Sequence, residues 1–157
     1  MNSNVVMILA AGIGIVAGLR TFTAPAVVSW AAYLGWLKLG ATPLAFMASS
    51  WSVAIFSLLA VGEFVGDVLP KTPNRTAPAP LLARMVSGGL CGACLCVAAN
   101  ESIWIGLLLG AIGAVIGAFA GYEIRKRLVA AWNVKDIFVA IPEDLVAVGL
   151  ALFIVTR

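Results

Sequence analysis

The chain has 157 residues, of which 62% are hydrophobic and 11% are charged, and its mean hydropathy is +1.08. This composition lies far outside the range of soluble globular proteins and is typical of a protein embedded in lipid. The net charge of +3 is too small to indicate a nucleic-acid-binding protein, and the absence of His removes the commonest metal ligand. Because spans of about 20 residues and their connections use the whole length, we expect a single integral membrane domain over residues 1–157.

The first apolar stretch, Val5 to Leu37, is too long for one crossing of a membrane. Its 33 residues would form a helix of about 50 Å, against a hydrocarbon core of about 30 Å. Residues 20–25 interrupt it with Arg20, the hydroxyl residues Thr21 and Thr23, and a proline. We predict a pair of half-helices or a re-entrant hairpin whose turn carries Arg20; a single kinked helix is the alternative.

Four apolar windows of 19 residues follow, each just long enough to cross a membrane as a helix. They are Leu44 to Gly62, Leu81 to Ala99, Ile103 to Gly121 and Ile137 to Val155. Together with the N-terminal region they predict an all-α, polytopic transmembrane bundle of about five to six short spans. Basic residues gather in the second and fourth connections, at 71–84 and 125–135, so the positive-inside rule places both connections in the cytoplasm and both termini outside.

Glu63 and Asp67 lie four residues apart, so they share one face of the predicted helix near its cytoplasmic end. Such a pair can hold a proton or a cation, or it can form salt bridges with Arg75 or Arg84. The connection from Leu69 to Pro80 contains four prolines, which predict a stiff, non-helical segment able to position Arg75.

Small residues recur every four positions in two predicted helices, which is typical of close helix contacts in lipid. They are Ala10, Gly14 and Gly18 before Arg20, and Gly113, Gly117 and Gly121 in the window from Ile103 to Gly121. The second set also offers a contact between copies of the chain. Cys91, Cys94 and Cys96 cannot all share one helix face, so we expect small packing residues rather than a soft metal site, and we expect no cofactor.

Pro142, Glu143 and Asp144 lie near the start of the last window. One interpretation is a helix start, with the two acids facing the positive end of the helix dipole. The alternative is that the proline breaks the span and the acids share a polar cavity with Arg20.

Three stretches resemble a family of small bacterial multi-pass inner-membrane proteins that is catalogued as a domain of unknown function. They are GLRTFTA at 18–24, EFVGDVLPKTPNRTAP at 63–78 with Arg84 beyond it, and GGLCGA at 88–93. The resemblance implies a bacterial inner-membrane location and points to the charged residues of these stretches, although Val68 stands where a basic residue would be expected. It brings no substrate.

These features favour a small transporter or lipid-handling protein over a membrane scaffold or accessory subunit packed through its glycines. In the first hypothesis Arg20 binds an anionic small molecule or lipid headgroup in a cavity of broken helices. The candidate substrate-binding residues are Arg20, Thr21, Thr23, Glu63, Asp67, Arg75, Arg84, Glu143 and Asp144. We expect no catalytic residue, because the sequence has no nucleophile motif and no metal-ligand spacing.

Overall fold

A computed structural model describes residues 2–67, 77–132 and 137–157, and these residues form helices and no strand. The elements are α1 (Ser3–Leu19), α2 (Thr23–Tyr33), the 3-10 helix η1 (Pro43–Ala48), α3 (Ser50–Asp67), α4 (Pro78–Ala98), α5 (Ile103–Trp132) and α6 (Ile137–Val155). The prediction of an all-helical chain is confirmed.

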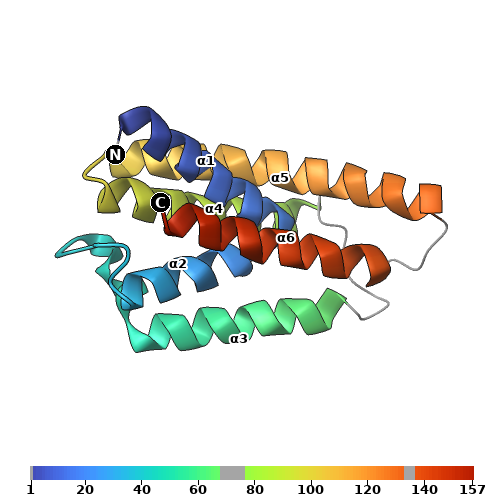
Figure 1. Ribbon diagram of the computed structural model, residues 1–157, viewed down its shortest axis with the longest axis horizontal. Helices are drawn as coiled ribbons and strands as arrows, with labels where there is room; N and C mark the ends of the chain where they lie inside the picture. Colours follow the sequence, from blue (N-terminus) through green and yellow to red (C-terminus); the bar gives the residue numbers. More distant parts are fainter. Residues whose placement is uncertain (1, 68–76, 133–136) are drawn as a thin grey trace.

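The long helices lie roughly antiparallel in one bundle, and both termini lie at the same end of it (Figure 1). α5 packs against both α1 and α4, α6 lies against α1 and α2, and α3 packs against α2. α1 therefore lies at the centre of the bundle, in contact with α2, α4, α5 and α6.

The predicted interruption at Arg20 separates two helices rather than kinking one. α1 has 17 residues and α2 has 11, and Arg20 between them has an extended backbone with φ −138° and ψ 116°. Figure 1 shows that α1 ends part-way along α5 and that α2 runs back toward the end that holds the termini. The turn at 20–22 thus lies inside the length of the bundle, beside the longer helices.

Several helix bounds differ from the predicted windows, and α3 ends at Asp67 rather than at Gly62. Residues 43–48 form η1, so α3 begins only at Ser50, and α5 continues eleven residues past Gly121 through the basic run to Trp132. α4 begins at Pro78 although the proline-rich connection was expected to be non-helical as far as Pro80; prolines are tolerated in a first helical turn, where amide groups have no helical partner anyway.

Pro142 does neither of the two things predicted for it, although one of the acids beside it, Asp144, lies at Arg20 as the second interpretation expected. α6 begins at Ile137 and continues through the proline, which therefore neither starts nor breaks the helix. Pro142 has no N–H to donate to the carbonyl one turn earlier, so α6 continues past it with one backbone hydrogen bond fewer.

Glycines bring the backbones of α1, α4 and α5 into direct contact. A Cβ atom placed on Gly110 would lie 2.1 Å from the carbonyl oxygen of Gly88 on α4, and one on Gly14 of α1 would lie 2.2 Å from that of Gly110. Gly113 and Gly117, considered above for contacts between copies, approach Ala11 and Ile15 of the same chain in this way. These positions admit no side chain without displacement of a helix.

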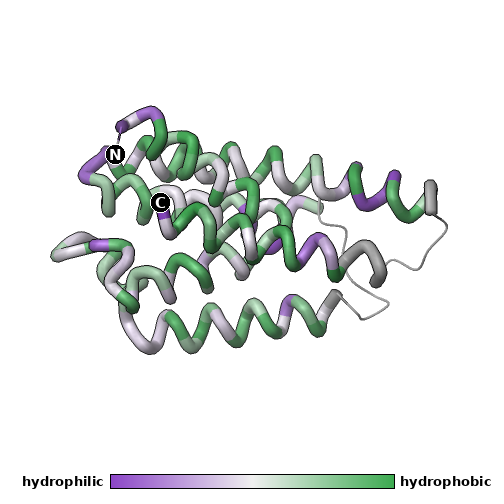
Figure 2. Tube along the Cα trace, in the orientation of Figure 1, coloured by the Kyte–Doolittle hydropathy of each residue, from purple (hydrophilic) through white to green (hydrophobic). Residues whose placement is uncertain are grey.

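The outer surface of the bundle is apolar. Trp51 is 77% exposed, Trp104 75% and Leu58 72%, and Figure 2 shows hydrophobic residues along α3 and α5 at the two edges of the view. By length and composition, α4 and residues 103–130 of α5 are able to cross a membrane, and α1 and α3 are shorter apolar helices.

Candidate functional site

Arg20 lies at the end of α1 and is almost completely buried, with 1% of its surface exposed. Its guanidinium donates through Nε to Oδ1 of Asp144 on α6, and Nη2 forms an ion pair with the same carboxylate oxygen. The ring of Phe64 on α3 covers the guanidinium, with 4.9 Å from Cζ to the ring centroid. Arg20 is therefore held between a carboxylate and an aromatic face.

Glu63 of α3 binds the start of α2. Its Oε1 accepts a hydrogen bond from the backbone N–H of Thr21 at 2.8 Å, and its Oε2 accepts one from the N–H of Phe22 at 2.9 Å. α2 has no capping side chain of its own. A carboxylate at this position satisfies amides that the helix leaves without partners, and it lies at the positive end of the helix dipole.

Arg84 of α4 binds the end of α1. Its Nη1 donates to the carbonyl oxygens of Gly18 and of Leu19, the latter at 2.9 Å, and its Nη2 lies 3.8 Å from Oε1 of Glu63. The hydroxyl of Ser87, one helical turn further along α4, donates to the carbonyl oxygen of Thr21. A cation thus faces the negative end of α1 while an anion faces the positive end of α2.

We call Arg20, Glu63, Arg84, Ser87 and Asp144 the break-point cluster. Next to Asp144 on α6, Glu143 lies 3.7 Å from the guanidinium of Arg125 on α5. With this pair, three arginines face three carboxylates, so the charges of these six residues balance. Buried charges are costly unless they are paired in this way.

The structure brings together most of the predicted site residues. Arg20, Glu63, Arg84 and Asp144 meet at the break, whereas Thr21 contributes its backbone groups and not its hydroxyl. The hydroxyl of Thr23 is buried and has no hydrogen-bond partner among the described residues. The side chain of Asp67 and all of Arg75 lie outside the described part of the chain.

Two contributors to the cluster were missed from the sequence. Ser87 carries no charge, and its only signal is its position three residues after Arg84, which places both on one helix face. Phe64 follows Glu63 in an apolar segment, where nothing distinguishes a ring that covers an arginine from a ring that faces lipid.

The cluster has the groups needed to bind an anion and none of the usual metal-binding sets. A guanidinium and a pair of helix N-terminal amides are two ways of binding a carboxylate or a phosphate, and here each already binds a carboxylate of the chain itself. Among the residues that the structure describes, no three His, Cys, Asp or Glu side chains lie together as they would around a metal ion. The three cysteines are instead buried in the helix contacts, in the packing position expected of them.

A comparison with protein families matches residues 7–156 to a domain of unknown function, DUF4126. The chain belongs to the DUF4126 family. This family match covers nearly the whole chain, including the break-point cluster, and it confirms the resemblance found in the sequence at the level of the family. Neither the curated proteins nor the solved structures contain a match to this DUF4126 chain.

Proposed function

We propose that this DUF4126 protein is a multi-pass protein of the bacterial inner membrane in which α1 and α2 form a re-entrant pair. The apolar outer surface supports this location, because exposed side chains such as Trp51, Leu58 and Trp104 are stable in lipid and unfavourable in water. The short lengths of α1 and α2 support the re-entrant pair, because neither helix alone matches a hydrocarbon core of about 30 Å.

The aromatic and basic residues indicate how the bundle is oriented in the membrane. Trp30, Trp36, Trp51 and Trp104 are exposed and belong to the ends of elements that gather at the end of the bundle holding both termini. The basic run at 125–127 belongs to the opposite end of α5. Tryptophan favours the membrane interface and basic residues favour the cytoplasmic side, so the termini face outward in this arrangement.

Within this membrane protein, we propose that the break-point cluster is the binding site of a small carrier for an anionic group, a phosphate or a carboxylate. One observation carries the proposal: the buried guanidinium of Arg20 lies at a break between two helices and is bound by a carboxylate from a different helix, α6. Carriers commonly build their sites from discontinuous helices with polar groups at depth. Asp144 occupies the place that the anionic group of a substrate would take.

The balance of charge in the cluster constrains how a substrate enters. Removing the carboxylate of Asp144 from Arg20 takes compensation away from a buried cation, and breaking a buried ion pair in this way costs about 3–5 kcal/mol. An incoming anion that takes over the guanidinium supplies that compensation, and a proton on the displaced Asp144 keeps the total charge unchanged. Transport by this carrier therefore requires that the substrate anion replaces the carboxylate of Asp144 at Arg20.

A scaffold or accessory subunit is the second candidate, and the same ion pairs favour it. If Glu63, Arg84 and Asp144 only hold the ends of α1 and α2 together, then the cluster is a structural joint with no ligand. In that case the apolar face of α3, which exposes Leu58 and Val65, is a surface for a partner helix.

A ligand screen on the detergent-purified full chain tests the two candidates. The melting temperature is measured with phosphates, carboxylates and anionic lipids for the native chain, for Arg20→Gln and for Glu123→Gln, which removes an exposed carboxylate that pairs with Arg127. The carrier predicts that one ligand class raises the melting temperature of the native chain and of Glu123→Gln but not that of a folded Arg20→Gln. If no ligand class raises it for any of the three proteins, the carrier is wrong and the scaffold is favoured.

A further inference from the structure

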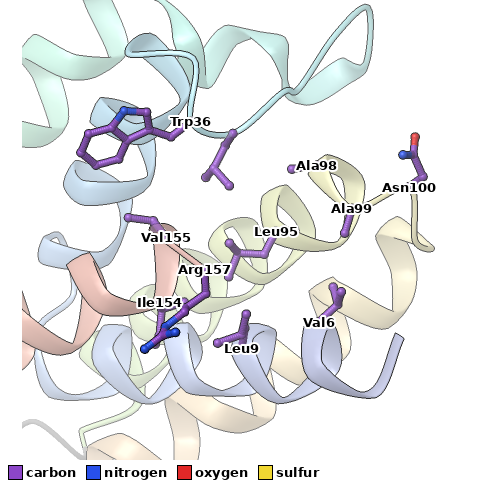
Figure 3. A pocket seen from close by; sticks show the side chains of 11 residues that line it. Val6, Leu9, Trp36, Leu95, Ala98, Ala99, Asn100, Ile154, Val155 and Arg157 are labelled. Atoms are coloured by element: carbon purple, nitrogen blue, oxygen red, sulfur yellow. The ribbon is translucent and has the colours of Figure 1, made fainter. Parts of the chain in front are cut away.

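A pocket lies at the end of the bundle that holds both termini, away from the break-point cluster (Figure 3). Its volume is about 340 Å³, within the range of small-ligand sites. It is lined by α1, the segment that follows α2, the end of α4 with the residues after it, and the end of α6. No residue of the break-point cluster lines it.

The lining of this pocket is amphipathic. Leu37, Leu95 and Val155 are buried and form an apolar wall, whereas Asn100 and Arg157 are exposed and mark a polar mouth. Leu9 and Ile154 also line the pocket, so apolar side chains and the cationic Arg157 border the same cavity. An occupant of such a pocket needs an apolar part and an anionic part.

Arg157 differs from the other arginines of the described chain. Arg20, Arg84, Arg125 and Arg127 each lie within ion-pair distance of a carboxylate. In the described ranges 2–67, 77–132 and 137–157, Arg157 has no such carboxylate, and its guanidinium instead lies 4.4 Å from the ring centroid of Phe153. The nearby Glu101 accepts a hydrogen bond from Ser3 and does not line the pocket.

From these observations we propose that the pocket binds an anionic phospholipid, with an acyl chain against Leu37, Leu95 and Val155 and the headgroup phosphate at Arg157. The exposed tryptophans at this end of the bundle put the mouth at the level of the lipid headgroups. A phospholipid placed there directs its apolar chain inward and its phosphate toward the mouth, as the lining requires. The site is separate from the carrier site, and it rests on the membrane location only.

Quenching of Trp36 fluorescence by brominated lipids tests the proposal, because Trp36 lines the pocket and bromine quenches tryptophan on contact. The other four tryptophans of the full chain are replaced by Phe, and the protein is reconstituted in phosphatidylcholine bilayers. A minor fraction of either phosphatidylglycerol or phosphatidylcholine then carries brominated acyl chains. We expect about fivefold enrichment of the anionic lipid at Trp36, the effect of one basic side chain near an anionic lipid.

Two variants and one competitor sharpen the result. Arg157→Gln removes the proposed phosphate contact and is expected to bring the two lipids to equal quenching, while Arg127→Gln, which removes an exposed arginine at the other end of the bundle, leaves the enrichment unchanged. Ala98→Phe adds a ring inside the pocket and is expected to lower quenching by both lipids. Excess inorganic phosphate is expected to have no effect, because it has no apolar part.

Equal quenching by the two lipids in the parent protein overturns the proposal, as does an enrichment that survives Arg157→Gln. Competition by inorganic phosphate also overturns it and indicates a free-anion site instead. Native mass spectrometry of the chain with all its tryptophans provides a second readout. More phosphatidylglycerol is expected to remain bound to the native chain than to Arg157→Gln, and equal retention contradicts the proposal.

Discussion

The contact between α4 and α5 consists of backbone against backbone, whereas the break between α1 and α2 is held by charged side chains from three other helices. In the first region Gly88, Gly92, Gly106 and Gly110 bring two long helices together with no room for a side chain. In the second, α3, α4 and α6 each supply a charge to the ends of two short helices. Packing can hold continuous helices together, but broken helix ends in an apolar medium need partners for their free backbone groups.

This difference has a consequence for function. A glycine contact has one arrangement, because the only groups involved are backbone atoms in van der Waals contact. An ion-pair contact has two, since the same guanidinium binds an internal carboxylate or an external anion with similar geometry. In the proposed carrier, the α1–α2 break is the place where an external anion replaces the internal carboxylate.

The largest effect is expected at the glycine contact. In Gly110→Leu the added side chain collides with the backbone of Gly88 and Gly89 on α4, so α4 and α5 must separate. We expect a loss of at least about 4 kcal/mol in the free energy of unfolding and little folded protein in detergent, measured by size-exclusion chromatography and thermal unfolding. Gly62→Leu is the control, because nothing lies within 4 Å of a Cβ at that glycine; equal damage by both substitutions would contradict the contact.

A smaller but still large effect is expected at the break. Arg84→Met removes the cation that binds the carbonyl groups of Gly18 and Leu19 and leaves Glu63 with less compensation, for a loss of about 3–5 kcal/mol. Adding Glu63→Gln to Arg84→Met is expected to cost less than the sum of the two single substitutions, because the two groups compensate each other. Full additivity in a double-mutant cycle of thermal unfolding would show that they are not coupled.

Replacing the buried hydroxyl of Thr23 is expected to raise stability slightly. Thr23→Val keeps the shape of the side chain and removes a hydroxyl that has no hydrogen-bond partner among the described residues, for a gain of up to about 1 kcal/mol. Thermal unfolding measures this gain. A clear loss of stability would mean that the hydroxyl is hydrogen-bonded in the folded protein.

The smallest effect is expected at the exposed pair on α5. Arg127 donates to Glu123 at 2.8 Å, but its side chain is 77% exposed, so solvent already satisfies both groups. Arg127→Gln is expected to leave the thermal unfolding of the protein unchanged. A drop comparable to that of Arg84→Met would remove the distinction between buried and exposed pairs in this bundle.

Much of this architecture could be predicted from the sequence, because apolar length and interrupting residues report directly on helices in lipid. The break at Arg20 and the positions of three helices, α4, α5 and α6, follow from this signal. The extension of α5 to Trp132 could not be predicted, since a basic run is compatible with a helix that leaves the membrane as well as with a loop. The start of α3 was placed too early because η1 is as apolar as the helix that follows it.

The charged residues of the site were easier to predict than the contacts that each of them makes. A charged residue in an apolar segment is visible in the sequence, which is how Arg20, Glu63, Arg84 and Asp144 were found. Which group each one binds depends on how α3, α4 and α6 lie around the break. The carboxylates of Glu63 and Asp67 were both candidates for a salt bridge with Arg84; the described contact is with Glu63, and the side chain of Asp67 lies outside the described residues.

Asp144→Asn tests whether Asp144 stands at Arg20 in the place of an external anion. The variant keeps the size of the side chain and removes its charge, so Arg20 is left to bind an anion from solution. Isothermal titration calorimetry measures the affinity for phosphate and for a short carboxylate. It is applied to the native chain, to Asp144→Asn and to the control Glu123→Gln. Anion binding is expected to be tighter in Asp144→Asn than in the other two proteins; equal or absent binding in a folded Asp144→Asn would mean that Asp144 does not stand in for an external anion.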